Sequence, residues 1–378
     1  HWPYKQQKTS RNIKTFPYHD HLKNKGACFG QVAGFESPLW FAINGEKPEF
    51  KYSFGYQNWY EAAKHETINT RNNVGFFELT PFAKFEIEGE TAHSSLQYLC
   101  SNNIKDNPGS ITYTQMLNSK GGIEADLSIT CISRNRYRII TGSGVREHDK
   151  KHILRYLDSN IKFSDITEEY VCFGIFGPKS RILLTEIIGN EFENEKFPFG
   201  TGKFLKIDNI DIWFQRLSYV GELGWELYIP FKESKKIYEI INRVGKNYNL
   251  THSGRLAMDI MRMEKGYLHW GHDISPAENP YEAGLGFAVK INKSNDFIGK
   301  KSLIDLKSHQ TKQLAMFALE NSKPGTPLLL QDEPIYYNKR IIGETTSGNY
   351  SFCYEKNIAF GYIDSKIDKQ NVKNEIFQ

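Results

Sequence analysis

The chain has 378 residues, of which 39% are hydrophobic and 14% aromatic, enough for a sizeable core and too many for a globally disordered chain. Mean hydropathy is −0.54, and no apolar run approaches the ~18–20 residues of a spanning helix, so an integral membrane protein is excluded. Basic residues (48) and acidic residues (44) are interspersed and give a net charge of +4. This pattern excludes a broad basic face for nucleic acid but allows a small anionic ligand.

Cysteine and histidine spacing argues against a disulfide framework or a metal site. The five cysteines are odd in number and form no C-x-x-C pair: Cys28, Cys100, Cys131, Cys172 and Cys353. They predict reduced, buried thiols in a cytosol-like compartment. No helical H-E-x-x-H occurs among the eleven histidines, so no metal site is expected. We expect a cytoplasmic location, or the mitochondrial matrix in a eukaryote.

Residues 1–55 carry scattered aromatic side chains between turn residues and lack a long helical period. They predict an irregular lead segment that wraps over another unit. Its aromatic residues include Trp2, Tyr4, Phe16 and Trp40. These side chains either form an exposed surface for a partner domain or pack on the chain's own body. Because the chain starts at His1 and ends in a polar run, and shows no signal or transit peptide, we expect a piece of a longer polypeptide.

From residue 56 the periodicity becomes regular. A first α+β half is predicted, with helices over 58–72, 91–100 and 146–160 and strands over 84–88, 111–117, 123–133 and 137–141. A second half is predicted with strands over 170–176, 211–217 and 225–229 and helices over 181–189, 234–246 and 254–267. The similar order suggests an internal duplication.

The last part of the chain predicts a small β-barrel. Short strands are expected over 314–319, 333–337, 339–346 and 359–363, separated by Gly and Pro turns. The barrel is expected to be truncated at the C-terminus. No G-x-G-x-x-G follows a strand, and neither a P-loop nor a G-x-S-x-G elbow occurs, which disfavours dinucleotide and P-loop binding on this chain.

Three clusters of residues could carry chemistry. In the first, a Gly121-Gly122 turn is followed by Asp126 on an otherwise apolar strand. A carboxylate beside a buried surface needs a partner or takes up a proton, so Asp126 could stabilise a cation or accept a proton. The alternative is a turn-capping or paired aspartate.

The second cluster runs from Tyr219 to Glu226. Gly221 and Gly224 allow close backbone approach, Tyr219 and Trp225 offer aromatic faces, and Glu226 could accept two hydrogen bonds from an amino-heterocycle. The alternative is a hairpin with a structural glutamate. The third cluster contains Arg262, Glu264 and Lys265, which could form only salt bridges, and the stretch His269-Trp270-Gly271-His272-Asp273.

Together these motifs resemble the aminomethyltransferase (glycine-cleavage T-protein) family. The resemblance rests on Gly121-Gly122-Ile123…Asp126, Tyr219-x-Gly221-Glu222-x-Gly224-Trp225-Glu226, Arg262-x-Glu264, Asp273-Ile274…Pro280-x-Glu282-Ala283-Gly284-Leu285 and Phe297-Ile298-Gly299. The lead segment and His269-Trp270-Gly271-His272-Asp273 are most similar to the folate-binding half of FAD-dependent dimethylglycine and sarcosine dehydrogenases.

The resemblance implies an α+β, folate-binding fold of two related lobes plus a C-terminal β-barrel. It divides the chain into a linker to a missing flavin domain (1–55), a folate-binding domain (56–305) and a truncated barrel (306–378). By similarity, Asp126 is the catalytic residue. Tyr219, Trp225, Glu226 and Arg262 are the expected cofactor-binding residues. Met258 stands where the T-protein has a folate-contacting arginine, and Arg262 is a candidate replacement.

The function implied is transfer of a one-carbon unit to tetrahydrofolate, giving 5,10-methylenetetrahydrofolate. The unit would come from an N-methylated amine such as dimethylglycine or sarcosine, oxidised by an FAD domain of the same polypeptide. The expected partners are tetrahydrofolate, the amine and that domain, without nucleic acid, membrane or metal. The alternatives are a stand-alone folate-dependent aminomethyltransferase or methyltransferase, and a non-catalytic module of the same fold.

Overall fold

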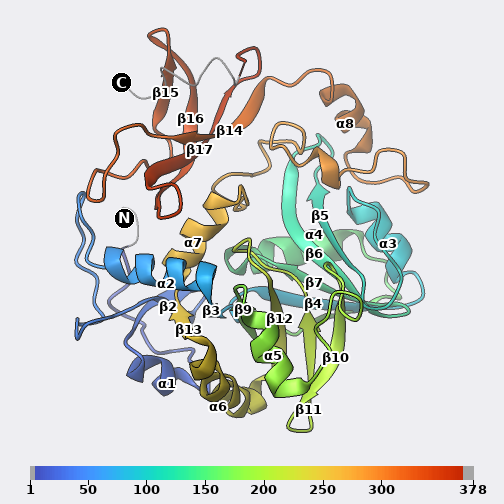
Figure 1. Ribbon diagram of the computed structural model, residues 1–378. Helices are drawn as coiled ribbons and strands as arrows, with labels where there is room; N and C mark the ends of the chain where they lie inside the picture. The colour runs from blue at the N-terminus through green and yellow to red at the C-terminus, as the bar shows by residue number, and fades with distance from the viewer. Residues whose placement is uncertain (1–4, 369–378) are drawn as a thin grey trace. The chain divides into compact units, whose positions relative to one another are not determined.

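The computed structural model describes residues 5–368, which form two compact units (Figure 1). The first unit combines the chain up to Phe85 with Asp165–Lys265, and the second combines Glu86–Ser164 with the chain from Gly266 onward. Each unit is therefore built from two separate stretches of sequence.

A six-stranded sheet forms the centre of the first unit, in the order β10-β11-β12-β9-β3-β13. Its strands are β3 (Val74–Glu78), β9 (Tyr170–Phe176), β10 (Gly202–Ile207), β11 (Ile210–Gln215), β12 (Gly224–Pro230) and β13 (Leu250–Ser253). Its helices are α2 (Tyr60–Asn72), α5 (Ser180–Ile188), α6 (Ser234–Gly245) and α7 (Arg255–Glu264). α2 packs against α7, and α5 against α6, so each pair covers part of the sheet with its apolar side.

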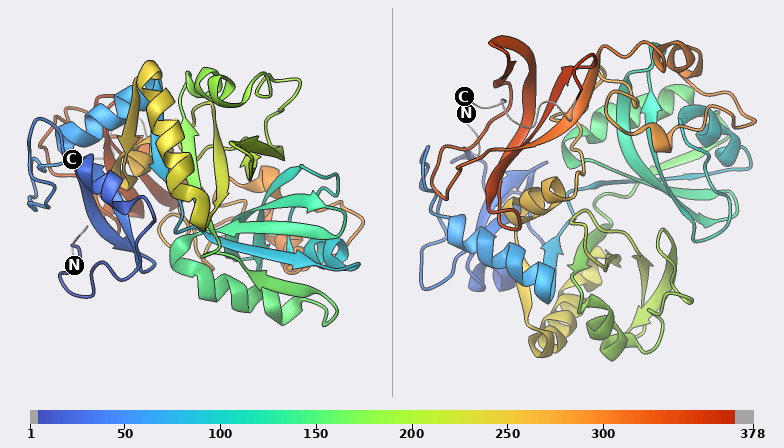
Figure 2. Two further views of the ribbon diagram at one scale, coloured as in Figure 1. Left: turned by 90° about the horizontal axis from the view of Figure 1, so that it is seen from below. Right: turned by 45° about the horizontal axis from the view of Figure 1, so that its top comes forward.

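The second unit contains a five-stranded sheet in the order β5-β6-β7-β4-β8. Its strands are β4 (Ala83–Glu88), β5 (Ile111–Leu117), β6 (Ile123–Ser133), β7 (Arg136–Thr141) and β8 (Lys162–Asp165), and its helices are α3 (Ala92–Leu99), α4 (Arg146–Tyr156) and α8 (Lys300–Leu306). A four-stranded antiparallel sheet, red in Figure 2, follows in the order β14-β17-β16-β15. These strands are β14 (Lys312–Ala318), β15 (Pro334–Tyr337), β16 (Arg340–Ser351) and β17 (Lys356–Asp364).

The internal duplication suggested by the sequence is visible in the topology. The order β4-α3-β5-β6-β7-α4-β8 recurs as β9-α5-β10-β11-β12-α6-β13. The two sheets also share one strand order, except that β3 is inserted between β9 and β13. The repeat is longer than predicted because the short strands β8, β10 and β13 give weak alternation in the sequence.

The lead segment is more regular than predicted. It contains α1 (His19–Asn24) and a hairpin of β1 (Ala27–Val32) and β2 (Phe35–Phe41). Phe16 stacks on Tyr18 and on Phe35, and Tyr18 stacks on Tyr238 of α6. These rings belong to the core of the first unit, so the segment completes a hydrophobic core rather than covering one loosely.

The prediction of an exposed aromatic docking surface is wrong for two of its residues. Phe16 is 3% exposed and Trp40 is fully buried, so both pack within the first unit, the alternative that the sequence left open. Trp2 and Tyr4 lie outside the described residues. The prediction of buried cysteines is confirmed for four thiols but is wrong for Cys353, which is exposed.

Element boundaries differ from the predictions mainly at helix ends. The helix predicted over 146–160 ends at Tyr156, and that over 254–267 ends at Glu264. The strand predicted over 339–346 continues to Ser351. β3 was not predicted because all five of its residues are buried, which removes the alternation that identifies a half-exposed strand.

Replacing Phe16 with Ala tests whether the lead segment belongs to the folded unit. We expect the free energy of unfolding to fall by about 3–5 kcal/mol, because the ring leaves a cavity among buried aromatics. Ile13→Ala is the control, since Ile13 is 73% exposed, and it should change the value by less than about 0.5 kcal/mol. Urea titration measures both variants, and equal small effects would contradict the packing described.

Candidate functional site

The β5–β6 hairpin positions Asp126 in the second unit. Gln115 and Asp126 are directly opposed in the antiparallel register, and Gln115 Nε2 donates to Asp126 Oδ1 at 2.8 Å. Gln115 is fully buried, and Tyr113 on the same strand also hydrogen-bonds the carboxylate. The strand register therefore fixes the orientation of a partly buried acid.

Burial determines the charge state of this acid. Desolvation raises the pKa of Asp126 to about 6; hydrogen bonds from Tyr113 and Gln115 act in the opposite direction, while the charge of Asp149 adds to the rise. A carboxyl group that titrates near neutral pH can both accept a proton and carry negative charge.

The glycine turn before Asp126 is tightly enclosed. Asn118 Oδ1 accepts hydrogen bonds from the backbone N–H groups of Lys120 and Gly122, and Gly121 adopts a φ of +88°. A Cβ at Gly122 would lie 2.0 Å from the carbonyl oxygen of Pro276, so only glycine fits there. The turn packs on the second unit's own backbone.

Next to Asp126 lies a pair of aromatic side chains that was not predicted from the sequence. The rings of Tyr113 and Phe287 stack with their centroids 6.1 Å apart, and Tyr113 is 36% and Phe287 66% exposed. Because Tyr113 also hydrogen-bonds Asp126, a ligand contacting the carboxylate has an exposed aromatic surface beside it. The hairpin register could have indicated Gln115, but Phe287 lies far away in sequence.

In the first unit, Glu226 is held in a similar manner. Gln215, opposite it on the neighbouring strand, donates to Oε2 at 2.8 Å, and the Tyr228 hydroxyl donates to the same oxygen at 2.7 Å. Trp213 Nε1 donates to Gln215 Oε1 at 3.4 Å, which orients the amide. Glu226 Oε1 has no hydrogen-bond partner among the described residues, so it is available to a ligand.

Burial also raises the pKa of Glu226, while hydrogen bonds from Tyr228 and Gln215 and the charge of Lys84 oppose the rise. A partly buried carboxylate with one oxygen lacking a partner gains from a ligand that donates N–H groups. Tyr219, also predicted for this site, lies half-buried in the turn before β12.

The interpretation of Trp225 as an aromatic face for a ligand is wrong. Its side chain is fully buried, packs edge-on against Phe192 and Phe197, and lies under the Arg216 guanidinium. Strand alternation explains this placement, because Trp225 and Glu226 point to opposite faces of β12. Gly224 approaches Ile175 of the neighbouring strand rather than a ligand, since a Cβ there would lie 2.4 Å from its carbonyl oxygen.

Arg262 is likewise engaged in structure. It is 2% exposed, and its Nε donates to Asp259 Oδ1 at 2.8 Å, one turn earlier on α7. The prediction that Arg262 binds the cofactor is therefore wrong for the guanidinium as placed here. Glu264 instead pairs with Arg71 at 2.7 Å, and Arg71 also bridges to Glu222 at 2.8 Å. These contacts match the salt-bridge alternative for the third cluster.

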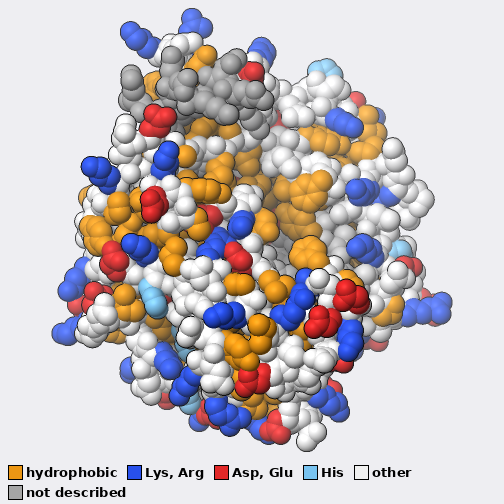
Figure 3. Space-filling view, in the orientation of Figure 1, with side chains coloured by type: hydrophobic (Ala, Val, Ile, Leu, Met, Phe, Trp, Pro, Cys, Tyr) orange, Lys and Arg blue, Asp and Glu red, His pale blue; other side chains and the backbone are white. Residues whose placement is uncertain are grey.

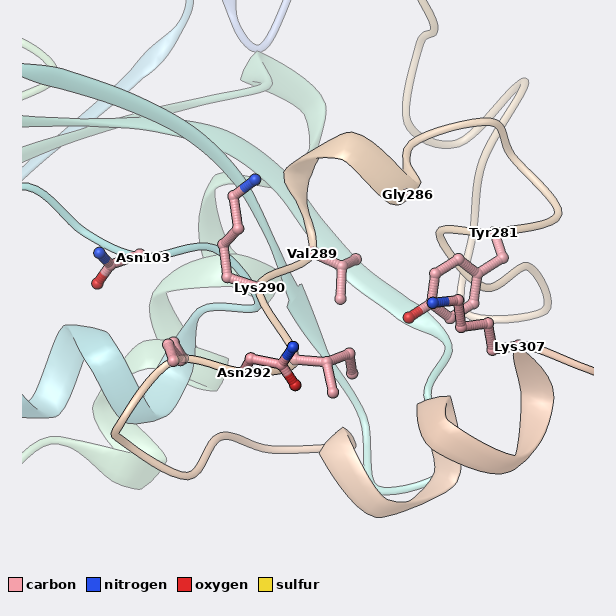
Figure 4. Close-up of a pocket in the computed structure, with 9 residues that line it drawn as sticks. Asn103, Tyr281, Gly286, Val289, Lys290, Asn292 and Lys307 are labelled. Atoms are coloured by element: carbon pink, nitrogen blue, oxygen red, sulfur yellow. The ribbon is translucent and has the colours of Figure 1, made fainter.

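A pocket of about 670 Å³ opens in the second unit. Figure 4 shows Lys307 beside Tyr281, and Lys290 and Lys293 also line the pocket. Lys293 Nζ donates to backbone carbonyls of Gln97, Cys100 and Asn102, so its hydrogen-bond donors are already occupied, and burial lowers its pKa to about 8. None of the predicted site residues lines this pocket.

The described part of the chain shows neither a one-sided charge distribution on the drawn face nor a metal-binding cluster. On the face drawn in Figure 3, basic and acidic side chains are interspersed. Within residues 5–368, no group of three or more His, Cys, Asp or Glu side chains could hold a metal ion. No helix in the same range is long and apolar enough to cross a membrane.

Two family models match the sequence. Residues 18–293 match the GCVT N-terminal domain, and residues 312–377 match the glycine cleavage T-protein C-terminal barrel domain. The fold and these matches define an aminomethyltransferase-type enzyme with an α+β body and a small C-terminal β domain. The chain belongs to the glycine cleavage T-protein family, which confirms the predicted resemblance and fold class.

The chain is also similar to individual proteins along nearly its whole length. It is 32% identical over 97% of its length to 4-methylaminobutanoate oxidase (formaldehyde-forming) from Paenarthrobacter nicotinovorans, and 33% identical over 92% to mitochondrial dimethylglycine dehydrogenase from Homo sapiens. The chain spans 44% and 40% of these two proteins. The crystal structure of aminomethyltransferase T from Bartonella henselae superposes with a TM-score of 0.78 at 22% identity, over 93% of this chain and 90% of that one.

The raised pKa of Asp126 has a consequence for stability. The folded chain holds this proton up to about pH 6, whereas the unfolded chain releases it near its ordinary pKa of 3.8, so the free energy of unfolding falls as pH rises from 3.8 to about 6 and stays at the lower value above that. Asp126→Asn should therefore raise the free energy of unfolding by about 1–3 kcal/mol at about pH 7.5, and by almost nothing near pH 4.

Urea titration at both pH values measures this difference. Asp305→Asn is the control, because Asp305 is exposed, and it should show no pH-dependent difference from the parent. An Asp126→Asn variant less stable than the parent at about pH 7.5 would show that the ionised carboxylate stabilises the fold.

Proposed function

We propose that this chain is the tetrahydrofolate-binding part of an FAD-dependent N-methyl-amine dehydrogenase of the dimethylglycine or sarcosine type. It would transfer the one-carbon unit to tetrahydrofolate and yield 5,10-methylenetetrahydrofolate. The observation that carries the proposal is the Glu226 carboxylate, which two internal donors orient while its Oε1 stays available to a ligand. The names of the two relatives, 4-methylaminobutanoate oxidase and dimethylglycine dehydrogenase, both refer to N-methylated amines and support the substrate class.

Asp126 is the proposed catalytic residue. Its carboxylate, oriented by Gln115, would stabilise the positive charge of an iminium and receive the proton released when the folate amine attacks. A pKa near 6 leaves the group mostly ionised at neutral pH. It is also close enough to neutral pH for the carboxylate to take up and release a proton readily.

Glu226 is the proposed anchor of the pteridine ring. An ionised carboxylate oxygen can accept hydrogen bonds from the amino and ring N–H groups of such a heterocycle. Tyr219 remains a proposed contact on the same unit. The exposed Tyr113–Phe287 pair fits the flat aromatic parts of a folate, since stacking on such a pair is favourable.

The flavin would be carried by a domain of the same polypeptide outside this chain, where bound FAD would oxidise the amine to the iminium. We propose residues 1–55 as the connection to that domain, 56–305 as the folate-binding domain and 306–378 as the barrel. The fractions of the relatives that the chain spans leave length for such a domain. A cytoplasmic or mitochondrial-matrix location is proposed with it.

Titration of the purified chain with tetrahydrofolate tests the ligand. Binding is expected, and Glu226→Gln should weaken it by about 1–3 kcal/mol, because the charge-assisted hydrogen bonds are lost. Glu233→Gln, an exposed acid on the same unit, is the control and should leave affinity unchanged. Calorimetry that gives equal affinities for both variants would remove Glu226 from the site. Stoichiometric FAD bound to the chain would contradict the separate flavin domain.

Asp126→Asn tests the chemistry in a protein that includes the flavin half. Amine oxidation should continue, while the yield of methylenetetrahydrofolate falls by roughly 10²–10³-fold and free formaldehyde rises. Asp305→Asn should behave as the parent does. A normal yield from Asp126→Asn would exclude Asp126 from the transfer.

A further inference from the structure

A second group of ionisable side chains lies beside Asp126 in the second unit. The first turn of α4 carries His148 and Asp149. His148 Nδ1 is 2.9 Å from Asp149 Oδ1, and its Nε2 is 3.2 Å from Glu124 Oε2. The histidine ring thus bridges two carboxylates, one from the helix and one from β6.

This bridge has a defined charge requirement. Both ring nitrogens can donate hydrogen bonds only when the imidazole is protonated. The geometry is therefore fully satisfied by an imidazolium placed between two carboxylates. A neutral ring carries a proton on only one of its nitrogens. The other nitrogen would then face a carboxylate oxygen with no hydrogen to donate.

The surroundings hold this bridge in place. Asp149 is fully buried and accepts a hydrogen bond from Thr141 at the end of β7. Asn118 Nδ2 donates to the second oxygen of Glu124 at 3.1 Å. The Trp270 ring lies 5.4 Å from the His148 ring, while 42% of the His148 side chain remains exposed.

The bridge reaches Asp126 by two routes. Glu124 and Asp126 are two residues apart on β6 and so share one face of the strand. The negative charge of Asp149 acts directly on the Asp126 carboxyl group and favours its protonated form. The ionisable groups that face Asp126 or the bridge are Tyr113, Glu124, His148, Asp149 and His152, with Arg155 acting on His152.

We propose that His148 and Asp149 are positioning residues that control the charge of the catalytic Asp126, with the protonated His148 compensating the buried Asp149 so that Asp126 stays ionised. This inference rests on the proposed function of Asp126. It assigns a role to a helix start that the sequence motifs do not mark. An uncompensated Asp149 would repel the Asp126 carboxylate and leave it protonated when an iminium arrives.

The proposal predicts opposite effects for the two residues. His148→Gln keeps hydrogen-bonding capacity but removes the positive charge, so the pKa of Asp126 should rise by roughly half a unit or more. Asp149→Asn removes the repelling charge, so the same pKa should fall. His148→Lys restores a cation and should keep the parent value. Glu147→Gln, a neighbouring residue on α4 whose carboxylate lies 3.9 Å from Lys150, is the control.

The experiment is a ¹³C NMR titration of the full chain, without folate, labelled at the aspartate carboxyl carbons. The Asp126 resonance is assigned by its loss in Asp126→Asn. The proposal would be supported if the pKa of Asp126 rises in His148→Gln but keeps the parent value in His148→Lys. A lower Asp126 pKa in Asp149→Asn would add to this support. An unchanged Asp126 pKa in His148→Gln, or the same shift in the Gln and Lys variants, would overturn it, even if Asp149→Asn fails to fold.

With the flavin half present, the rate of methylenetetrahydrofolate formation should fall on the acid side of its pH profile. The apparent pKa of that fall should shift in each variant in the same direction as the pKa of Asp126 in the titration. Because the titration needs neither folate nor turnover, it decides the electrostatic inference separately. Failure of the parent chain to bind tetrahydrofolate would instead count against the proposed function.

Discussion

Each of the two candidate carboxylates, Asp126 and Glu226, is kept partly buried in an antiparallel part of a sheet. Burial alone would protonate them, because a charge without a partner is costly in a medium of low dielectric. In both units an amide from the adjacent strand opposes this effect: Gln115 contacts Asp126, and Gln215 contacts Glu226. The strand register sets these pairs, so any shift of one residue between the strands would separate donor from acid and turn the side chains to the opposite face.

The fold supplies this register twice. A β-α-β-β-β-α-β unit appears once around β4–β8 and again around β9–β13, and the carboxylates lie on a different strand in each copy. In the repeat, the strand that matches Glu226's β12 is β7. That strand carries the buried Arg138, which pairs with Glu86 at 2.8 Å. The two copies therefore share one scaffold and differ in the polar side chains that it carries.

The sequence was sufficient to predict the fold class and the hairpin around Asp126, because these depend on local periodicity and turn chemistry. It misplaced Trp225 and Arg262, since strand alternation and an i, i+3 ion pair decide their burial, and motif spacing carries neither. Phe287 and the His148–Asp149 pair were missed because their proximity to Asp126 arises only when distant segments meet. Phe16 and Trp40 were ambiguous in the sequence, where exposed and buried aromatic residues look alike.

The interleaving of the two units has a consequence for synthesis. The first unit begins with the N-terminal residues but lacks five of the six strands of its sheet until the stretch ending at Lys265 has been made. The second unit's first stretch, Glu86–Ser164, emerges in between and must wait in turn for the chain after Gly266. On a ribosome, the six-stranded sheet of the first unit cannot be completed before about two thirds of this chain has left the exit tunnel, so β3 lacks its neighbouring strands in early intermediates. No single cleavage could release either unit whole.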